Sequence, residues 1–152
     1  MDPVTDWLSS DTTLTGLPLA FLLGALVGAE REWRQNAAGL RSCVLVSVAA
    51  AGFADLMTTR VEPGNLGAAF GAIATGVGFI GAGVILRRGM TVRGLSTAAT
   101  FWAVAAVGTA SGVEEFGMAL GLTVLVFSAH VALRPISALI ERKAPPAEAG
   151  PR

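Results

Sequence analysis

The sequence contains little of what soluble enzymes and nucleic-acid-binding proteins are built from. Only 14% of its 152 residues are charged, and it has one histidine, one cysteine and no tyrosine. Because acidic and basic residues balance, the net charge gives no reason to expect a nucleic acid as partner. The single cysteine, Cys43, excludes an internal disulfide and a zinc site built on several thiolates. We expect it to serve as a small apolar packing residue.

What the sequence has instead is long apolar runs, and hydrophobic residues make up 53% of it. This composition is typical of an integral membrane protein. Uncharged stretches close to the roughly 20 residues that cross a bilayer core recur along the chain. We therefore predict an all-α membrane protein, a bundle of about five transmembrane helices. The expected spans are residues 12–29, 40–59, 66–86, 95–113 and 116–133.

Positive charge is distributed unevenly between the turns. Of the 11 lysines and arginines, all but Arg60 follow the first, third or fifth span. By the positive-inside rule the N-terminus lies outside and the C-terminus in the cytoplasm. Residues 1–11 are then an extracytoplasmic tail, without the basic start of a cleavable signal peptide. Residues 12–140 form the membrane domain, and residues 141–152 a disordered cytoplasmic tail.

The third span, residues 66–86, is rich in glycine. In water each glycine would weaken a helix by about 1 kcal/mol against alanine. In lipid the helix persists and its bare faces let neighbouring helices approach closely. We predict that it lies at the centre of the bundle, bonded by Ser96, Thr97 and Thr100 of the fourth span. Alternatively, glycine breaks it at mid-membrane and exposes backbone to a substrate. The packing or pathway glycines are Gly24, Gly28, Gly76, Gly78, Gly81 and Gly83.

Charged residues gather at the cytoplasmic ends of the first two spans and in the loop after the third. Glu30 and Arg34 are four residues apart with the acid first, the favourable order for a helical ion pair. Two interpretations are open: a solvated helix end with topology-setting arginines, or a buried ion-pair network that gates the bundle or receives an anionic ligand. The residues concerned are Glu30, Arg31, Glu32, Arg34, Arg41, Arg87 and Arg93.

Two further residues are candidates for carrying a proton. Asp55 is the acid furthest inside a span, yet close enough to the outer interface to be solvated. His130 precedes Arg134 by one turn and has no second ligand nearby, so we expect a packed or interfacial side chain, or else a pH sensor. Residues 76–81 match GxGxxG but lack the preceding strand of a dinucleotide site. We expect no metal, no cofactor and no enzymatic activity.

Two blocks of the sequence resemble signatures of a known family. They read GALVGAEREWRQNAAGLRSCVLVSVAA and GVGFIGAGVILRRGMTVRGLSTAATFWAVAAVG, and they are similar to the MgtC/SapB family of bacterial inner-membrane proteins over residues 17–135. The resemblance implies a multi-pass inner-membrane protein, tied in parts of the family to growth at low magnesium, acid tolerance and survival inside host cells. Some members carry a soluble C-terminal domain, which we do not expect here because little sequence follows the fifth span.

Two functions are compatible with these features. The first is a non-enzymatic regulator that binds other membrane proteins, or further copies of itself in a homo-oligomer, through small-residue helix faces. Its basic loops would contact anionic lipids. The alternative is a small ion or solute transporter or channel, acting as an oligomer with a site between the first and third helices near Glu30. The scarcity of charge at mid-membrane favours the first, because ion translocation usually needs polar groups there.

Overall fold

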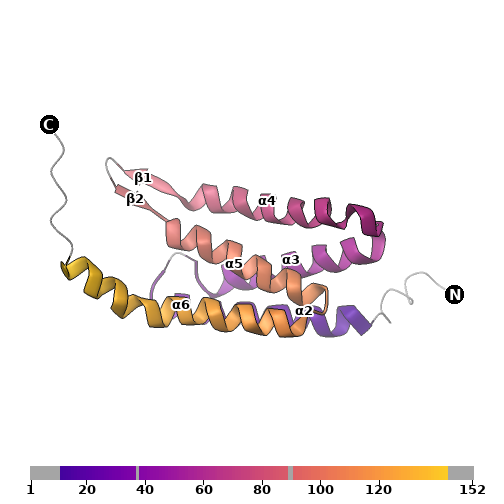
Figure 1. The fold of residues 1–152 in the computed structure, drawn as a ribbon, viewed down its shortest axis with the longest axis horizontal. Coiled ribbons are helices and arrows are strands. Elements are labelled where there is room, and N and C mark those ends of the chain that lie inside the picture. The colour runs from indigo at the N-terminus through magenta and orange to yellow at the C-terminus, as the bar shows by residue number, and fades with distance from the viewer. Residues whose placement is uncertain (1–10, 37, 89–90, 144–152) are drawn as a thin grey trace.

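The computed structural model describes residues 11–36, 38–88 and 91–143. Within them the chain is almost entirely helical, so the predicted all-α bundle is confirmed. The elements are α2 (Asp11–Trp33), α3 (Leu40–Arg60), the 3-10 turn η1 (Pro63–Asn65), α4 (Leu66–Val84), β1 (Leu86–Arg88), β2 (Thr91–Arg93), α5 (Leu95–Gly112) and α6 (Phe116–Lys143). The helices run alongside one another (Figure 1). Most of the predicted tails, 1–11 and 141–152, falls outside the described residues.

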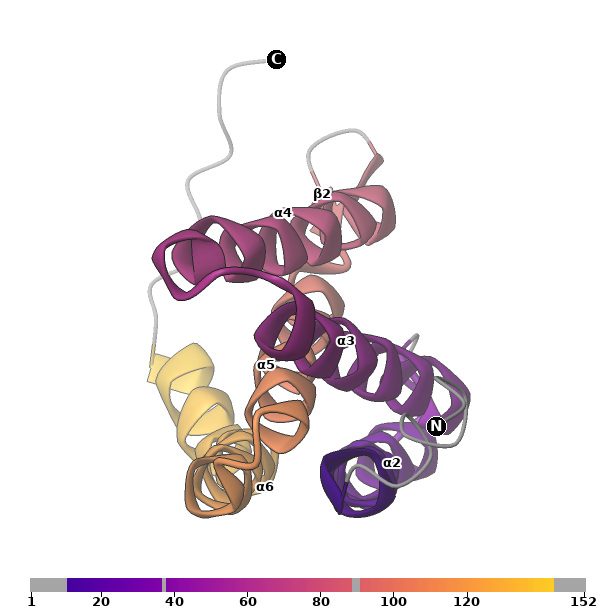
Figure 2. The same ribbon diagram turned by 90° about the vertical axis from the view of Figure 1, so that its right-hand side faces the viewer.

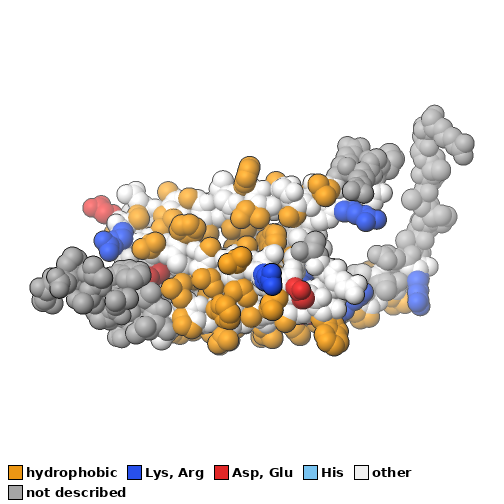
Figure 3. All heavy atoms as spheres, turned by 180° about the vertical axis from the view of Figure 1, so that it is seen from behind, with side chains coloured by type: hydrophobic (Ala, Val, Ile, Leu, Met, Phe, Trp, Pro, Cys, Tyr) orange, Lys and Arg blue, Asp and Glu red, His pale blue; other side chains and the backbone are white. Residues whose placement is uncertain are grey.

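Three of the described helical segments are long and apolar enough to cross a membrane: Leu40–Arg60, Pro63–Val84 and Phe116–Ser137. They expose many large hydrophobic side chains, among them Phe79 and Leu125. On the face seen in Figure 3, hydrophobic side chains cover the middle of the bundle, and most charged side chains lie toward its two ends. Such an apolar surface is costly in water and is expected of a protein surrounded by lipid.

The centre of the bundle is α5, and not the glycine-rich third span as predicted. Viewed along its axis, the bundle places α5 between the other helices, and it packs against all four of them (Figure 2). More than half of its residues are buried, including Thr100, Val104 and Ser111. A helix can carry serine and threonine where those side chains face other helices and not lipid, as Thr100 and Ser111 do. Its low hydropathy therefore gives no sign that α5 is the central helix of the bundle.

Small residues bring α3 into close contact with α2 and α5. A Cβ added to Gly28 of α2 would lie 2.8 Å from the Cα of Leu40, and one added to Gly24 would lie 2.8 Å from the Cβ of Ser47. On the opposite side, Gly108 of α5 leaves no room for a Cβ beside the carbonyl oxygen of Ser47. These close approaches are what GxxxG-type spacing permits in membranes.

Ser47 is fully buried where α2, α3 and α5 meet, and its hydroxyl donates to the carbonyl of Ala20 on α2 at 2.8 Å. We expect Ser47→Ala to lower the free energy of unfolding by about 0.6 kcal/mol, the average for interhelical bonds in a membrane protein. Ser137→Ala is the matched control, because the exposed Ser137 hydroxyl bonds only within its own helix. Reversible unfolding in mixed micelles measures both. Equal losses would contradict an interhelical role for Ser47.

The glycine-rich helix α4 lies at the edge, against α5 and, less extensively, α3. It is continuous from Leu66 to Val84, so the predicted helix is confirmed and the alternative, a break at mid-membrane, is not formed. The Trp102 indole N–H donates to the carbonyl of Ala74 at 3.3 Å, and Gly81 packs on Ala98 of α5. The bond from α5 to α4 thus comes from a tryptophan and not from the predicted serine and threonines.

The turns are distributed between the two ends of the bundle as an antiparallel arrangement requires. The α2–α3 turn, the β1–β2 hairpin and the C-terminal end of α6 lie at one end (Figure 1). The segment predicted as a basic loop is this hairpin, with Leu86 opposite Arg93 and Arg87 opposite Val92. Gly94, at φ +93°, turns the chain from the hairpin into α5, where a side chain would be strained.

Helix α6 is longer than predicted. It passes through Pro135 and ends at Lys143, so the boundary expected between residues 140 and 141 falls inside a helix. A proline removes one backbone hydrogen bond but is tolerated in membrane helices. The exposed side chains of Ile136, Leu139 and Ile140 continue the apolar surface beyond the proline.

Candidate functional site

Three helices each bring a pair of polar residues, four positions apart, to the same end of the bundle. The pairs are Glu30 on α2 with Arg34 in the turn just after it, Ser96 and Thr100 on α5, and His130 and Arg134 on α6. Residues at this spacing share one face of a helix. A pocket of about 240 Å³ lies among them, lined by Glu30, Arg31, Arg34, Asn36, Ser96, His130 and Arg134. We call this set of residues the polar pocket.

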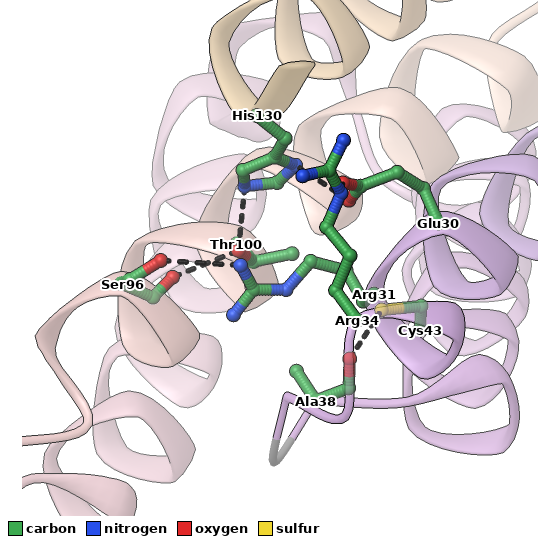
Figure 4. A network of polar contacts seen from close by, with 8 residues as sticks. All are labelled: Glu30, Arg31, Arg34, Ala38, Cys43, Ser96, Thr100 and His130. Atoms are coloured by element: carbon green, nitrogen blue, oxygen red, sulfur yellow. Dashed lines mark hydrogen bonds and ion pairs between the residues drawn. The ribbon is translucent and has the colours of Figure 1, made fainter. Parts of the chain in front are cut away.

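Glu30 is the one carboxylate that lines the polar pocket, and its side chain is only 8% exposed. Its Oε1 pairs with Nε of Arg34, as the i,i+4 spacing predicts, and its Oε2 lies 3.8 Å from Nδ1 of His130. Neither oxygen accepts a hydrogen bond of ordinary geometry, so charge holds Arg34 against Glu30, and it attracts His130 only when the imidazole is protonated. Figure 4 shows Arg34 and His130 converging on Glu30.

Arg31 is buried although it is charged. The residue is 5% exposed, and its guanidinium donates from Nη1 to the hydroxyl oxygen of Ser96 on α5 at 3.2 Å (Figure 4). Its Nε is buried and has no hydrogen-bond partner among the described residues. A guanidinium carries five donor N–H groups and keeps its charge in proteins, so Arg31 has donor capacity beyond its bond to Ser96.

Local backbone structure closes the polar pocket beside the end of α2. Gln35 adopts a left-handed conformation with φ 56°, which ends the helix. The N–H of the next residue, Asn36, then donates back to the carbonyl of Arg31 at 3.0 Å. This turn places Asn36 against the pocket formed by the helices.

The structure joins Thr100, His130 and Glu30 in a hydroxyl–imidazole–carboxylate series that the sequence did not indicate. His130 Nε2 lies 3.1 Å from Thr100 Oγ1, and Thr100 donates its proton to the carbonyl of Ser96 at 2.8 Å. Because that hydroxyl has one proton, Nε2 is the donor toward Thr100. A general base would instead accept the hydroxyl proton. Thr100 is also only 2% exposed. This geometry holds His130 in place and does not activate a nucleophile.

The predicted charge cluster is divided between two faces of this end of the bundle. Glu32 points away from the polar pocket and accepts from the backbone N–H of Leu40 at 2.8 Å, which caps the start of α3. Arg41 is exposed and lines a separate hollow with Glu32 and Gly39. Arg93 is exposed on β2. The backbone of Arg87 belongs to β1, but its side chain lies outside what the structure describes.

The other predicted residues are also dispersed. Asp55 is buried on α3 and not solvated, and its Oδ1 has no hydrogen-bond partner among the described residues. His130 is packed in the polar pocket. Of the candidate glycines, Gly24 and Gly28 of α2 pack against α3, and Gly81 of α4 packs against α5. The remaining three have nothing within 4 Å of an added Cβ: Gly76, Gly78 and Gly83.

The alternative site between the first and third predicted helices is not formed. These helices are α2 and α4, and α3 and α5 lie between them (Figure 2). Glu30 instead faces α5 and α6. The residues that sequence reasoning missed at this site are Asn36, Ser96, Thr100 and Arg134. The available signal was the i,i+4 spacing of polar side chains on α5 and α6, since such pairs are rare in apolar spans.

Comparison with known proteins gives the chain a family. The sequence profile of the MgtC family matches residues 17–139. Protein MgtC of Salmonella typhi is 45% identical over 141 residues, which cover 91% of this chain and 60% of that protein. Protein MgtC of Salmonella typhimurium is 47% identical over 123 residues, 80% of this chain and 52% of that protein. Protein MgtC of Brucella abortus is 40% identical over 141 residues, which cover 91% of this chain and 58% of that protein.

The chain thus spans between about half and three-fifths of the length of these relatives. No solved structure matches it. The profile match covers most of the chain, and the relatives are well above the identity at which common descent is in question. The matched region includes the ends of α2, α5 and α6 that form the polar pocket. This chain belongs to the MgtC family.

Proposed function

We propose that this protein is a non-enzymatic regulator of the bacterial inner membrane that acts by binding other membrane proteins, in adaptation to low magnesium or acid stress. The observation that carries the proposal is the exposed face of α4. Gly67, Gly71 and Gly78 lie there, and an added Cβ would meet nothing within 4 Å at any of them. With Thr75 and Ala82, also exposed, they form a continuous ladder of small residues at helical spacing.

This face has a cost that no contact among the described residues offsets. Glycine weakens a helix relative to alanine, and at Gly24 and Gly28 of α2 close contacts with α3 accompany it. Small-residue ladders allow a second helix to approach so closely that van der Waals contacts stabilise the pair in lipid. The natural occupant of the α4 face is therefore a helix from another membrane protein or from a second copy of this chain.

The proposal includes five membrane-crossing helices with the N-terminus outside. Helices α2 and α5 are not among the three that are long and apolar enough to cross a membrane, but they lie alongside those three (Figure 1). The arginine-bearing turns share one end of the bundle, and Arg60 lies at the other. Placing the arginine-rich end in the cytoplasm satisfies the positive-inside rule and brings the hairpin close to anionic lipid.

We expect Gly71→Ile to abolish partner binding while the chain still folds. The added side chain projects into open space in the single chain but prevents a second helix from reaching the α4 backbone. A photo-crosslinking residue at Thr75 captures the partner, and the crosslinked fraction should fall by about tenfold, as a loss of about 1.4 kcal/mol in association implies. In a strain of the source bacterium whose own copy of this chain is deleted, the same variant should no longer support growth in low-magnesium medium.

Gly121→Ile on α6 is the matched control, since Gly121 is also exposed and has nothing within 4 Å of an added Cβ. It should crosslink and support growth like the unmodified chain. Identical unfolding of both variants shows that folding is unaffected. If Gly71→Ile binds and supports growth as Gly121→Ile does, the α4 face is not the functional surface and the proposal fails.

A further inference from the structure

We propose that the polar pocket is a binding site for a phosphate-type oxyanion, carried either by a lipid headgroup or by a soluble phosphate compound. The pocket lies among α2, α5 and α6, on the far side of α5 from α4 (Figure 2). This inference goes beyond the proposed function, because it does not depend on the α4 face or on what that face binds.

The balance of charge in the polar pocket selects an anion. Three guanidinium groups line it, those of Arg31, Arg34 and Arg134, against the single carboxylate of Glu30. Arg34 is already paired with Glu30, so Arg31 and Arg134 have no carboxylate of their own in the pocket. Among the described residues no cluster of acidic, histidine or cysteine side chains could hold a metal ion. No acidic side chain that lines the pocket therefore balances the charges of Arg31 and Arg134.

The donors in the polar pocket match the acceptors of a tetrahedral oxyanion. Nε of Arg31 is buried without a hydrogen-bond partner among the described residues, and buried polar atoms in native proteins nearly always have one. Guanidinium groups bind phosphate with paired N–H groups, and such charge-assisted bonds are stronger than neutral ones. Arg31 is also fixed from α5 by Ser96, so its fork is held in place before any ligand arrives.

Size and position narrow the ligand further. At about 240 Å³ the pocket is smaller than the 300–1,000 Å³ typical of drug-sized ligands, so it suits a small ion or a headgroup and not a nucleotide. Arg134 is exposed on α6, at the same end of the bundle as the basic hairpin. With this end of the bundle at the cytoplasmic surface, as proposed above, a lipid headgroup and a solute in the adjoining water both lie near the pocket.

The soluble ligand is tested with inorganic phosphate on the purified, delipidated full chain in detergent. Calorimetric titration should show binding that sulfate, another tetrahedral oxyanion, competes away and chloride does not. Arg134→Gln and Arg31→Lys should each weaken phosphate binding by about tenfold or more, because each removes charge-assisted donors. Arg41→Gln is the matched control: Arg41 is exposed near the same end of the bundle but does not line the pocket. It should leave phosphate binding within about twofold.

The lipid ligand is tested by reconstituting the full chain in phosphatidylcholine nanodiscs with and without phosphatidic acid. A headgroup in the pocket should raise the unfolding temperature in phosphatidic acid, since a ligand that binds only the folded state stabilises it. Arg134→Gln should lose this increase and Arg41→Gln should keep it. A response to phosphatidic acid alone assigns the site to a lipid headgroup, and a response to phosphate alone assigns it to a soluble compound.

Two results would overturn the inference. One is the absence of both responses in the unmodified chain. The other is a response that Arg41→Gln diminishes as much as Arg134→Gln does, because the anion would then be attracted by general surface charge. Arg134 is exposed and has no hydrogen bond or ion pair in the described structure, so Arg134→Gln is expected to fold. This variant therefore tests the inference even if Arg31→Lys fails to fold.

Discussion

Gly108→Ala is expected to destabilise the bundle severely, although it adds a single methyl group. Gly108 lies on the central helix α5, and an added Cβ would collide with the backbone carbonyl oxygen of Ser47 on α3. Overpacking a core typically costs 1–3 kcal/mol. Here the obstacle is backbone and cannot rotate away, so we expect a loss of about 3 kcal/mol or more in the free energy of unfolding. The same logic applies to Gly112, which faces the carbonyl of Ala51.

Gly76→Ala on α4 is the matched control, and its effect should have the opposite sign. Nothing lies within 4 Å of a Cβ added to Gly76, and alanine is the better helix former by up to about 1 kcal/mol. Reversible unfolding in mixed micelles, followed by circular dichroism, measures both variants. Similar unfolding curves for the two would contradict the assignment of α5, and not α4, to the centre of the bundle.

Glu30→Gln is expected to cost about 3 kcal/mol in the free energy of unfolding. Removing one partner of a buried ion pair leaves the other charge uncompensated, at a typical cost of 3–5 kcal/mol. We take the lower end because the Arg34 side chain is 28% exposed, so water partly screens its charge. Glu32→Gln is the control next in sequence: Glu32 is exposed, and glutamine keeps the oxygen that caps Leu40. It should change stability by less than about 0.5 kcal/mol.

A double-mutant cycle separates this pairing from other effects of the substitution. Adding Arg34→Gln to Glu30→Gln should recover part of the lost stability, because it removes a charge that lacks its partner. Phosphate binding should change in the opposite direction to stability. Glu30→Gln removes the only negative charge that lines the polar pocket, so it should tighten phosphate binding while it destabilises the fold. If Glu30→Gln unfolds like Glu32→Gln, then the charges at this end of the bundle are solvated, the interpretation that the sequence left open.

The positions of the helices were predictable because lipid imposes a simple rule on the chain. Uncharged runs of bilayer length must be helical, and the charges that end them must lie near water. Thus α3, α4 and α5 begin and end within a few residues of their predicted limits. The extension of α6 to Lys143 was missed, since a proline after Arg134 normally signals a helix end in water but is tolerated in a membrane helix.

The order of the helices in space was not predictable in the same way. Glycine content suggested that the third span was central, but a bare face only permits close contact and does not say with which helix. The helix that became central, α5, gave a weak signal because its serines and threonines lower its hydropathy. Because four neighbouring helices pack against α5, most of those serines and threonines are buried in protein and not exposed to lipid.

The class of the protein, the approximate limits of its helices and the i,i+4 spacing of Glu30 and Arg34 could be predicted from the chain alone, because these depend on local spacing and on the solvent. The burial of Arg31, the separate position of Arg41, and the pocket that Ser96 and His130 complete around Glu30 depend on how the helices pack. These residues lie up to about a hundred positions apart. Their meeting is set by which helix faces pack together, and many packings satisfy the same apolar pattern.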